Sequence, residues 1–177
     1  LLFQSLTAGD IHICALTSGG AAYCWGTAFG DGSTVGSTVP RAVLGAPTLQ
    51  SLDAGGRHTC GLTSGGAAYC WGLNWLGQVG NGTAGGLVAT AAAVTGGQAF
   101  TAIALGAKHS CARTTGGTVY CWGNGTDGEL GSTVQSFSLS PAVVGGAPVL
   151  QSIAPAGEHA CGLTGAGVAS CWGDNKY

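Results

Sequence analysis

The stretch His58–Gly72 reads HTCGLTSGGAAYCWG, and closely similar stretches occur at three other places in the chain. Each copy contains a histidine, two cysteines ten positions apart, a glycine-containing centre and a terminal Cys-Trp-Gly. The other copies span His12–Gly26, His109–Gly123 and His159–Gly173. The first cysteines stand at positions 14, 60, 111 and 161, so the repeat steps are 46, 51 and 50 residues. Internal repetition at this period indicates a propeller, a solenoid or a similar array.

One copy of this motif predicts a β-hairpin. Two short runs flank residues 64–66, Ser-Gly-Gly, and a three-residue loop with glycine in the left-handed conformation is a common hairpin connection. With this loop, Leu62 faces Ala68 and Cys60 faces Cys70. Opposite side chains on antiparallel strands have Cβ atoms about 4.5–5.5 Å apart, and a disulfide needs about 3.5–4.5 Å. A disulfide across the hairpin is therefore feasible after a slight local adjustment.

The constant spacing of the cysteines predicts one disulfide within each hairpin. Two alternatives stay open at this point, namely buried free thiols and metal ligands. The chain contains no CxxC pair, and a histidine two positions before a cysteine shares its strand face rather than completing a tetrahedral site. We therefore expect no metal and no cofactor. The predicted pairs are Cys14–Cys24, Cys60–Cys70, Cys111–Cys121 and Cys161–Cys171.

Composition narrows the class of protein. Of the 177 residues, 35 are glycine and 45% are hydrophobic, whereas only 7% are charged. This composition is unlike that of a disordered chain and fits many short strands joined by turns. The net charge of −2 and five scattered basic residues give no basic face for nucleic acid. No apolar run reaches about 18 residues, so we expect no membrane span.

The segments around the motif complete a four-stranded unit. An apolar run precedes each motif and is expected to form a first strand, and the motif supplies the second and third strands. Further runs at Pro40–Leu44, Val88–Val94 and Pro141–Val144 are expected to form a fourth strand in the first three units. Proline at a strand start suits an edge strand, which needs fewer ladder hydrogen bonds. The fourth strand is therefore placed at the outer edge.

These patterns predict an all-β fold of propeller-like blades, each with four antiparallel strands. The expected single repeat domain spans residues 1–177, with units at 1–46, 47–97, 98–147 and 148–177. The last unit lacks a segment for the outer strand. An unpaired strand edge is a template for another chain. We expect either a longer polypeptide or a partner that supplies the missing strand.

The repeats resemble those of the regulator of chromosome condensation family, and the resemblance covers essentially the whole chain. It rests on AGGRHTCGLTSGGAAYCWGLNWLGQVGNGT (54–83) and GAKHSCARTTGGTVYCWGNGTDGELGS (106–132). The resemblance implies a propeller blade whose first strand is innermost and whose fourth is outermost. Family members usually form seven blades, so four units are too few for that ring.

The paired cysteines resemble the bacterial, extracellular branch, some of whose secreted propellers bind and inhibit enzymes. The nucleotide-exchange activity is not implied, because the insertion that engages the GTPase has no counterpart here.

The remaining motif residues are expected to serve the structure rather than chemistry. One histidine per unit predicts a repeated structural hydrogen bond, with a metal site on the propeller axis as the alternative. The aromatic residues beside the cysteines predict apolar packing between blades, with carbohydrate stacking as the alternative. The histidines are His12, His58, His109 and His159. The aromatic residues are Trp25, Trp71, Trp122, Trp172, Tyr23, Tyr69 and Tyr120.

Trp75 breaks the repeat and is predicted to lie in a loop as an exposed contact residue. The sequence has no GxSxG, no P-loop and no catalytic dyad, so we expect no enzyme activity.

Eight cysteines in four equal pairs predict a secreted or cell-surface protein. Our leading hypothesis is an extracellular scaffold that assembles with copies of itself into a ring, tube or filament through open blade edges. The alternative is part of a longer secreted propeller that binds another protein or a glycan through its loops.

Overall fold

The computed structural model describes residues 1–27, 30–133 and 136–176, which form strands and turns without a helix. The first sheet contains β1 (Phe3–Ala8), β2 (His12–Thr17), β3 (Ala22–Gly26) and β4 (Ser37–Ala42). The second contains β5 (Ser51–Ala54), β6 (His58–Leu62), β7 (Ala68–Leu73) and β8 (Leu87–Ala93). The third contains β9 (Phe100–Leu105), β10 (His109–Thr114), β11 (Val119–Asn124) and β12 (Phe137–Val143). The fourth contains β13 (Leu150–Ala156), β14 (His159–Thr164) and β15 (Ala169–Gly173).

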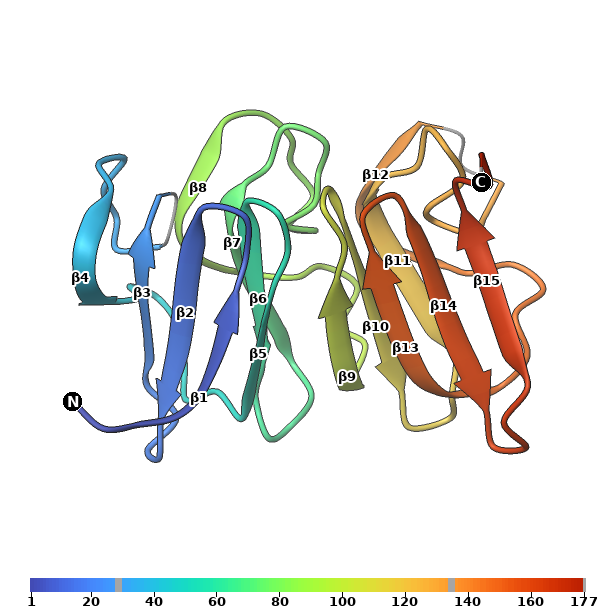
Figure 1. The fold of residues 1–177 in the computed structure, drawn as a ribbon, viewed down its shortest axis with the longest axis horizontal. Helices are drawn as coiled ribbons and strands as arrows, with labels where there is room; N and C mark the ends of the chain where they lie inside the picture. The colour runs from blue at the N-terminus through green and yellow to red at the C-terminus, as the bar shows by residue number, and fades with distance from the viewer. Residues whose placement is uncertain (28–29, 134–135, 177) are drawn as a thin grey trace.

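Each sheet is an antiparallel meander, and its strands lie in chain order. The four sheets follow one another along the long axis of the molecule, with the two ends of the chain at opposite ends (Figure 1). The first strands β1, β5, β9 and β13 lie next to one another along the inner side of the array. The prediction of all-β, propeller-like blades is confirmed, and the four sheets do not close into a ring.

The central hairpin of each blade has the register that the cysteine spacing predicts. Leu62 pairs with Ala68 and Cys60 with Cys70, and the equivalent pairs occur in the other three blades. The three-residue turn closes with a hydrogen bond from Gly66 N to Thr63 O at 3.0 Å. Gly66 has φ +81°, which a side chain would strain. Glycine at the end of this loop therefore fixes the hairpin register.

The outer strands differ from the prediction in where they begin. β4 starts at Ser37 and β12 at Phe137, so Pro40 and Pro141 lie inside these strands rather than at their starts. In both strands the register with the neighbouring strand shifts at the proline segment. A proline has no N–H for the ladder, so it fits an edge strand where the ladder is interrupted.

The hydrophobic core lies between the blades rather than inside one blade. The described residues form three buried clusters, and each joins the hairpin of one blade to the tryptophan of the next. Trp71 packs on blade one and Trp122 on blade two, both with no exposed surface, and the partly buried Trp172 packs on blade three. A sheet must bury its apolar face against another element, and here the next blade provides it.

A glycine of the preceding blade closes over each of these indole rings. A Cβ added to Gly30 would lie 2.6 Å from Trp71 Cδ1, one on Gly80 2.5 Å from Trp122 Nε1, and one on Gly131 2.8 Å from Trp172 Cδ1. The indole N–H groups of Trp122 and Trp172 donate to the backbone carbonyls of Gln78 and Glu129, each at 3.0 Å. We call this arrangement the indole socket: a loop of one blade encloses the tryptophan of the next.

The socket predicts that Gly80→Ala is more harmful than an alanine at another left-handed glycine. Gly80 and Gly86 have nearly equal φ angles of +74° and +71°, but no heavy atom lies within 4 Å of a Cβ added to Gly86. Both substitutions cost about 1–2 kcal/mol for the left-handed backbone. Only Gly80→Ala also overpacks the indole, at a further cost of about 1–3 kcal/mol. Urea unfolding followed by tryptophan fluorescence, with disulfides intact, measures the difference. Equal losses in the two variants would contradict the socket.

Candidate interaction surfaces

Four disulfides join β2 to β3, β6 to β7, β10 to β11 and β14 to β15. The paired Cα atoms are 4.0–4.1 Å apart, and the described residues contain no free cysteine. The three pairs of blades one to three are completely buried. In blade four, Cys161 is half-buried and Cys171 is exposed. Every disulfide thus lies within one blade, and none connects two blades.

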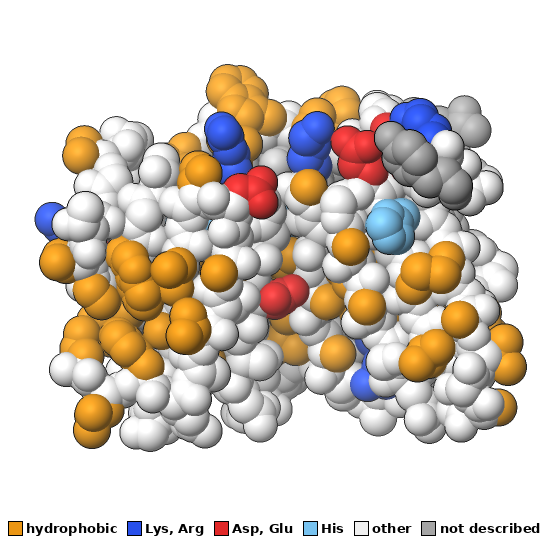
Figure 2. Space-filling view, viewed as in Figure 1, with side chains coloured by type: hydrophobic (Ala, Val, Ile, Leu, Met, Phe, Trp, Pro, Cys, Tyr) orange, Lys and Arg blue, Asp and Glu red, His pale blue; other side chains and the backbone are white. Residues whose placement is uncertain are grey.

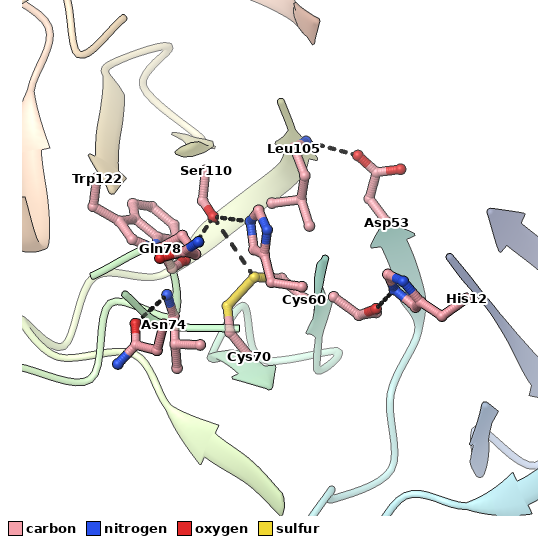
Figure 3. Close-up of a disulfide and its surroundings, with 12 residues drawn as sticks. His12, Asp53, Cys60, Cys70, Asn74, Gln78, Leu105, Ser110 and Trp122 are labelled. Carbon is pink, nitrogen blue, oxygen red and sulfur yellow. Dashed lines mark hydrogen bonds between the residues drawn. A yellow bond between two sulfur atoms is a disulfide. The ribbon is translucent and has the colours of Figure 1, made fainter. Parts of the chain in front are cut away.

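Hydrogen bonds between a histidine and a hydroxyl group connect the first three blades. His12 Nε2 lies 2.6 Å from Thr59 Oγ1, and His58 Nε2 lies 2.9 Å from Ser110 Oγ. The Ser110 hydroxyl donates to the Gln78 carbonyl at 2.8 Å, so it must accept from the protonated Nε2 of His58. Ser110 lies between Gln78, Trp122 and the Cys60–Cys70 disulfide (Figure 3). The histidine contact and the indole socket therefore meet at one carbonyl.

The histidine hydrogen bond expected in every unit is absent from blades three and four in the described part of the chain. His109 is fully buried, but Ala160 occupies the position of Thr59 and Ser110, so neither ring nitrogen of His109 has a partner. His159 is exposed at the end of the array. The position after the next blade's histidine decides whether the contact forms, and alanine offers no acceptor.

Burial keeps these histidines neutral. Desolvation lowers the pKa of His58 to about 3, with smaller contributions from the neighbouring His109 and His12. Desolvation likewise lowers the pKa of His109 to about 4, helped by His159, and also lowers that of His12. No group of three or more His, Cys, Asp or Glu side chains that could hold a metal ion occurs among residues 1–27, 30–133 and 136–176. The Nε2 atoms of His12 and His58 are instead used between blades.

Asp53, which the sequence analysis did not single out, connects three inner strands. Its carboxylate accepts from Leu105 N of β9 at 2.7 Å (Figure 3). It also accepts from Thr7 Oγ1 of β1 at 3.3 Å. Thr7 Oγ1 in turn accepts from Ala54 N at 3.1 Å. Burial raises the pKa of Asp53, and the backbone hydrogen bonds partly oppose this shift. The hydrogen-bond partners of Asp53 are 46 and 52 residues away in sequence, so no local pattern predicts that it connects these strands.

Blade one has the same phenylalanine–tryptophan stacking as blade three, but no preceding blade covers it in the described structure. Phe3 stacks on Trp25 with ring centroids 6.2 Å apart, as Phe100 stacks on Trp122 at 6.1 Å in blade three. Phe3 is 37% exposed, whereas Phe100 is 4% exposed because blade two covers it. Hydrophobic side chains gather at this end of the molecule, over β1 and β2 (Figure 2). We call Phe3, Tyr23 and Trp25 the blade-one face.

At the opposite end of the array, the blade-four hairpin exposes the surface that the next blade covers in the other three units. A groove there is lined by His159, Cys161, Cys171, Trp172, Gly173, Asp174 and Asn175. Leu163 is 46% exposed, although the equivalent Leu16 and Leu62 are 3% and 4% exposed under the next blade. In the described part of blade four, β15 pairs with β14 only. We call this groove, together with Leu163, the blade-four face.

A second groove crosses the turns of three blades. It includes Asp10 of blade one, Arg57 and Trp75 of blade two, and Lys108 of blade three. Trp75 is 63% exposed and lies in a loop that follows β7. Lys108 faces Glu158 at 3.9 Å, whereas Arg57 has no ion-pair partner among the described residues. Trp75 is thus exposed beside charged side chains, which gather along this edge of the molecule (Figure 2).

These features define a class of protein: a β-propeller repeat array whose blades are joined through aromatic residues. The model of the regulator of chromosome condensation (RCC1) repeat matches residues 50–78 and 100–129. These two segments therefore match RCC1 repeats, and all four blades have a disulfide in the central hairpin. A search of curated protein sequences found no match.

Solved structures share the fold. Prp20p of Saccharomyces cerevisiae has a TM-score of 0.84 at 23% identity, covering 97% of this chain and 45% of that one. Human WBSCR16 has a TM-score of 0.86 at 20% identity, with coverage of 97% and 47%. The ectodomain of the Physcomitrella patens receptor kinase CR4 has a TM-score of 0.64 at 26% identity, with coverage of 97% and 40%. The chain spans less than half the length of each of these proteins.

The neutral buried histidines predict a loss of stability in acid. In the unfolded chain a histidine takes up a proton near pH 6.5, whereas folded His58 and His109 do so only near pH 3 and 4. The free energy of unfolding should therefore fall between pH 6.5 and 4, by up to about 1.4 kcal/mol per pH unit for each such histidine. Asp53 acts in the opposite direction, since its raised pKa adds stability that is lost as the pH rises.

Urea unfolding at several pH values measures this slope. His58→Gln should reduce the slope, because glutamine can still donate to Ser110 but does not titrate. His159→Gln is the matched control, because it makes the same substitution at an exposed histidine. A stability that stays constant between pH 6.5 and 4 would contradict the neutral, buried state.

Ala160→Ser should restore the missing hydrogen bond. The new hydroxyl would occupy the position that Ser110 has in blade three and would accept from His109. A buried neutral hydrogen bond contributes about 0.5–1.5 kcal/mol to stability, so the free energy of unfolding should rise by that amount. The reverse change, Ser110→Ala, should cost about 1–3 kcal/mol because it leaves His58 unpaired. If Ala160→Ser is no more stable than the parent in urea unfolding, the assignment is wrong.

Proposed function

We propose that this chain is a non-enzymatic, extracellular scaffold of RCC1-type blades that associates end to end with copies of itself. One observation carries the proposal: three internal junctions use the same pair of surfaces, and one member of that pair is exposed at each end. In each junction the tryptophan side of one blade packs against the hairpin of the preceding blade. The blade-one face is an exposed tryptophan side, and the blade-four face is an exposed hairpin side. Because the two faces differ, their contact would be heterologous and would produce a ring or a filament.

The disulfides support the proposed extracellular location. Four cystines in one small chain persist in an oxidising compartment such as the cell exterior. No helix in the described residues has the length and hydropathy of a membrane span. Nucleic acid is not among the proposed partners, since only five of the 177 residues are basic and nucleic acid needs a clustered basic face.

The contact between copies would be weaker than an internal junction. Ile13 occupies the position of Thr59 and Ser110, so blade one offers no hydroxyl group to His159 of a second copy. The described part of blade four also contains no counterpart of the loop around Gly80 that encloses an indole. The blade three–four junction shows that the histidine contact is dispensable, because Trp172 packs there without it. Aromatic packing would therefore provide most of the affinity.

Light scattering after size-exclusion chromatography tests the proposal. The mass should rise above the 17.2 kDa of one chain as the concentration increases. Trp25→Ser should abolish the increase, because it removes the indole of the blade-one face. Trp75→Ser, which changes an exposed tryptophan elsewhere, should leave it intact. A chain that stays at 17.2 kDa at every concentration up to its solubility limit would overturn the proposal.

A second candidate function is binding of another protein or a glycan through the groove around Trp75. The specific observation is an exposed indole in a groove that spans three blades, beside Arg57, which has no ion-pair partner within the described ranges. The solved relatives support a role in protein binding. One is a complex of yeast RCC1 (Prp20) with Kap60, and another is described with its binding properties to Gsp1p and histones. This function needs no association between copies and is compatible with a monomer.

A further inference from the structure

The turn that carries Trp75 does not need a tryptophan in order to form. The turn after β11 contains the same backbone hydrogen bonds as the turn after β7. Thr126 occupies there the position of Trp75, and the following residue is Asp127 where this turn has Leu76. The same backbone therefore forms with two polar residues. A large, mostly exposed apolar side chain that the fold does not require is typical of a binding surface.

Hydrogen bonds fix the backbone on both sides of Trp75. The preceding residue, Asn74, is completely buried, and its Oδ1 accepts from Val79 N at 3.0 Å. The following residue, Leu76, donates its N–H to Gln78 Oε1 at 2.9 Å. The indole is thus presented by a loop that is already ordered. Binding on such a loop avoids the entropy cost of ordering a mobile segment.

The groove around Trp75 combines this indole with two cationic side chains. Arg57 lies in the turn between β5 and β6, Lys108 lies in the turn between β9 and β10, and both are exposed. The pair between Lys108 and Glu158 has exposed side chains and a separation of 3.9 Å, so a ligand can displace it at little cost. Among the lining residues, the only carboxylate is that of Asp10. Lys and Arg side chains lie beside hydrophobic ones along this edge (Figure 2).

We propose that this groove binds a short extended peptide in which an acidic residue stands close to a large apolar one. The carboxylate of the peptide would accept two parallel hydrogen bonds from the guanidinium of Arg57, and Lys108 would add electrostatic attraction. The apolar side chain of the peptide would pack against the indole of Trp75. This inference rests on the second candidate function, binding through the groove, and does not depend on self-association.

The lining of the groove favours a peptide over a glycan. Leu73, Leu76 and Ala107 line it together with Trp75, which provides an apolar surface for an apolar side chain. Tryptophan and arginine are also enriched among the residues that contribute most to the affinity of protein interfaces. The groove crosses the turns of three blades, so it suits an extended segment.

Selection from a phage-displayed library of short random peptides tests the proposal. The library is selected on the immobilised 177-residue chain and, in parallel, on the Trp75→Ser variant. Peptides enriched on the parent alone should share an acidic residue next to a large apolar one. Enrichment of basic peptides, or of apolar peptides without an acidic residue, would overturn the proposed chemistry.

The dissociation constant of one enriched, fluorescently labelled peptide is then measured by anisotropy. Arg57→Gln should weaken binding by roughly tenfold or more, because it removes a charged hydrogen-bond donor. Arg41→Gln is the matched control at an exposed arginine on β4 and should leave the constant unchanged. Both substitutions are at exposed side chains, and urea unfolding verifies that the variants stay folded. Equal affinities of the parent and Arg57→Gln would overturn the proposal.

Charge changes provide a second readout. Asp10→Asn should tighten binding, because it removes a carboxylate that repels the acidic residue of the peptide. Added salt should weaken binding to the parent, since the charges involved are accessible to solvent. An affinity that stays constant over this range of salt concentration would overturn the role of Arg57 and Lys108.

The outcomes separate this inference from the function on which it rests. A panel of oligosaccharides, neutral and acidic, is tested on the same chain. If only an oligosaccharide binds, and Trp75→Ser abolishes that binding, the groove is a binding site but the peptide proposal is wrong. If no peptide and no oligosaccharide binds in a way that Trp75→Ser reduces, both the peptide proposal and binding through the groove are wrong. Trp25→Ser should leave the affinity for the peptide unchanged, because Trp25 does not line the groove.

Discussion

The insertion of a tryptophan into the loop of the preceding blade is the contact on which the array depends. Each blade has too small an interior for a core of its own, so its apolar face must be covered by a neighbour. The indole provides this cover, and the N–H groups of Trp122 and Trp172 also donate to backbone carbonyls of the loops that enclose them. Glycines such as Gly80 are needed because the ring comes so close to the backbone.

Covalent and non-covalent stabilisation are divided between two levels of the structure. The disulfides fix the hairpin inside a blade, and the aromatic residues, histidine contacts and Asp53 join one blade to the next. The hairpin of a blade is therefore fixed covalently, whereas the junctions between blades depend on packing and hydrogen bonds.

Much of the blade could be predicted from the sequence because its determinants are local. The ten-residue cysteine spacing and the Ser64–Gly66 turn fix the hairpin register within one short segment. Contacts between blades could not be predicted in the same way. The missing partner of His109 is decided by Ala160, 51 residues later, and the role of Asp53 depends on strands of two other blades. The outer prolines were placed at strand starts because a local pattern does not reveal an interrupted ladder.

Because every cystine closes on its own hairpin, the molecule would respond to tension in steps. A pulling force applied to the two ends loads the inter-blade packing, since no covalent crosslink spans a junction. Blades would then detach one after another. In each detached blade, the disulfide would prevent the residues between its two cysteines from being stretched. Such a chain absorbs mechanical work in small portions and keeps a folded nucleus in every unit from which the array can re-form.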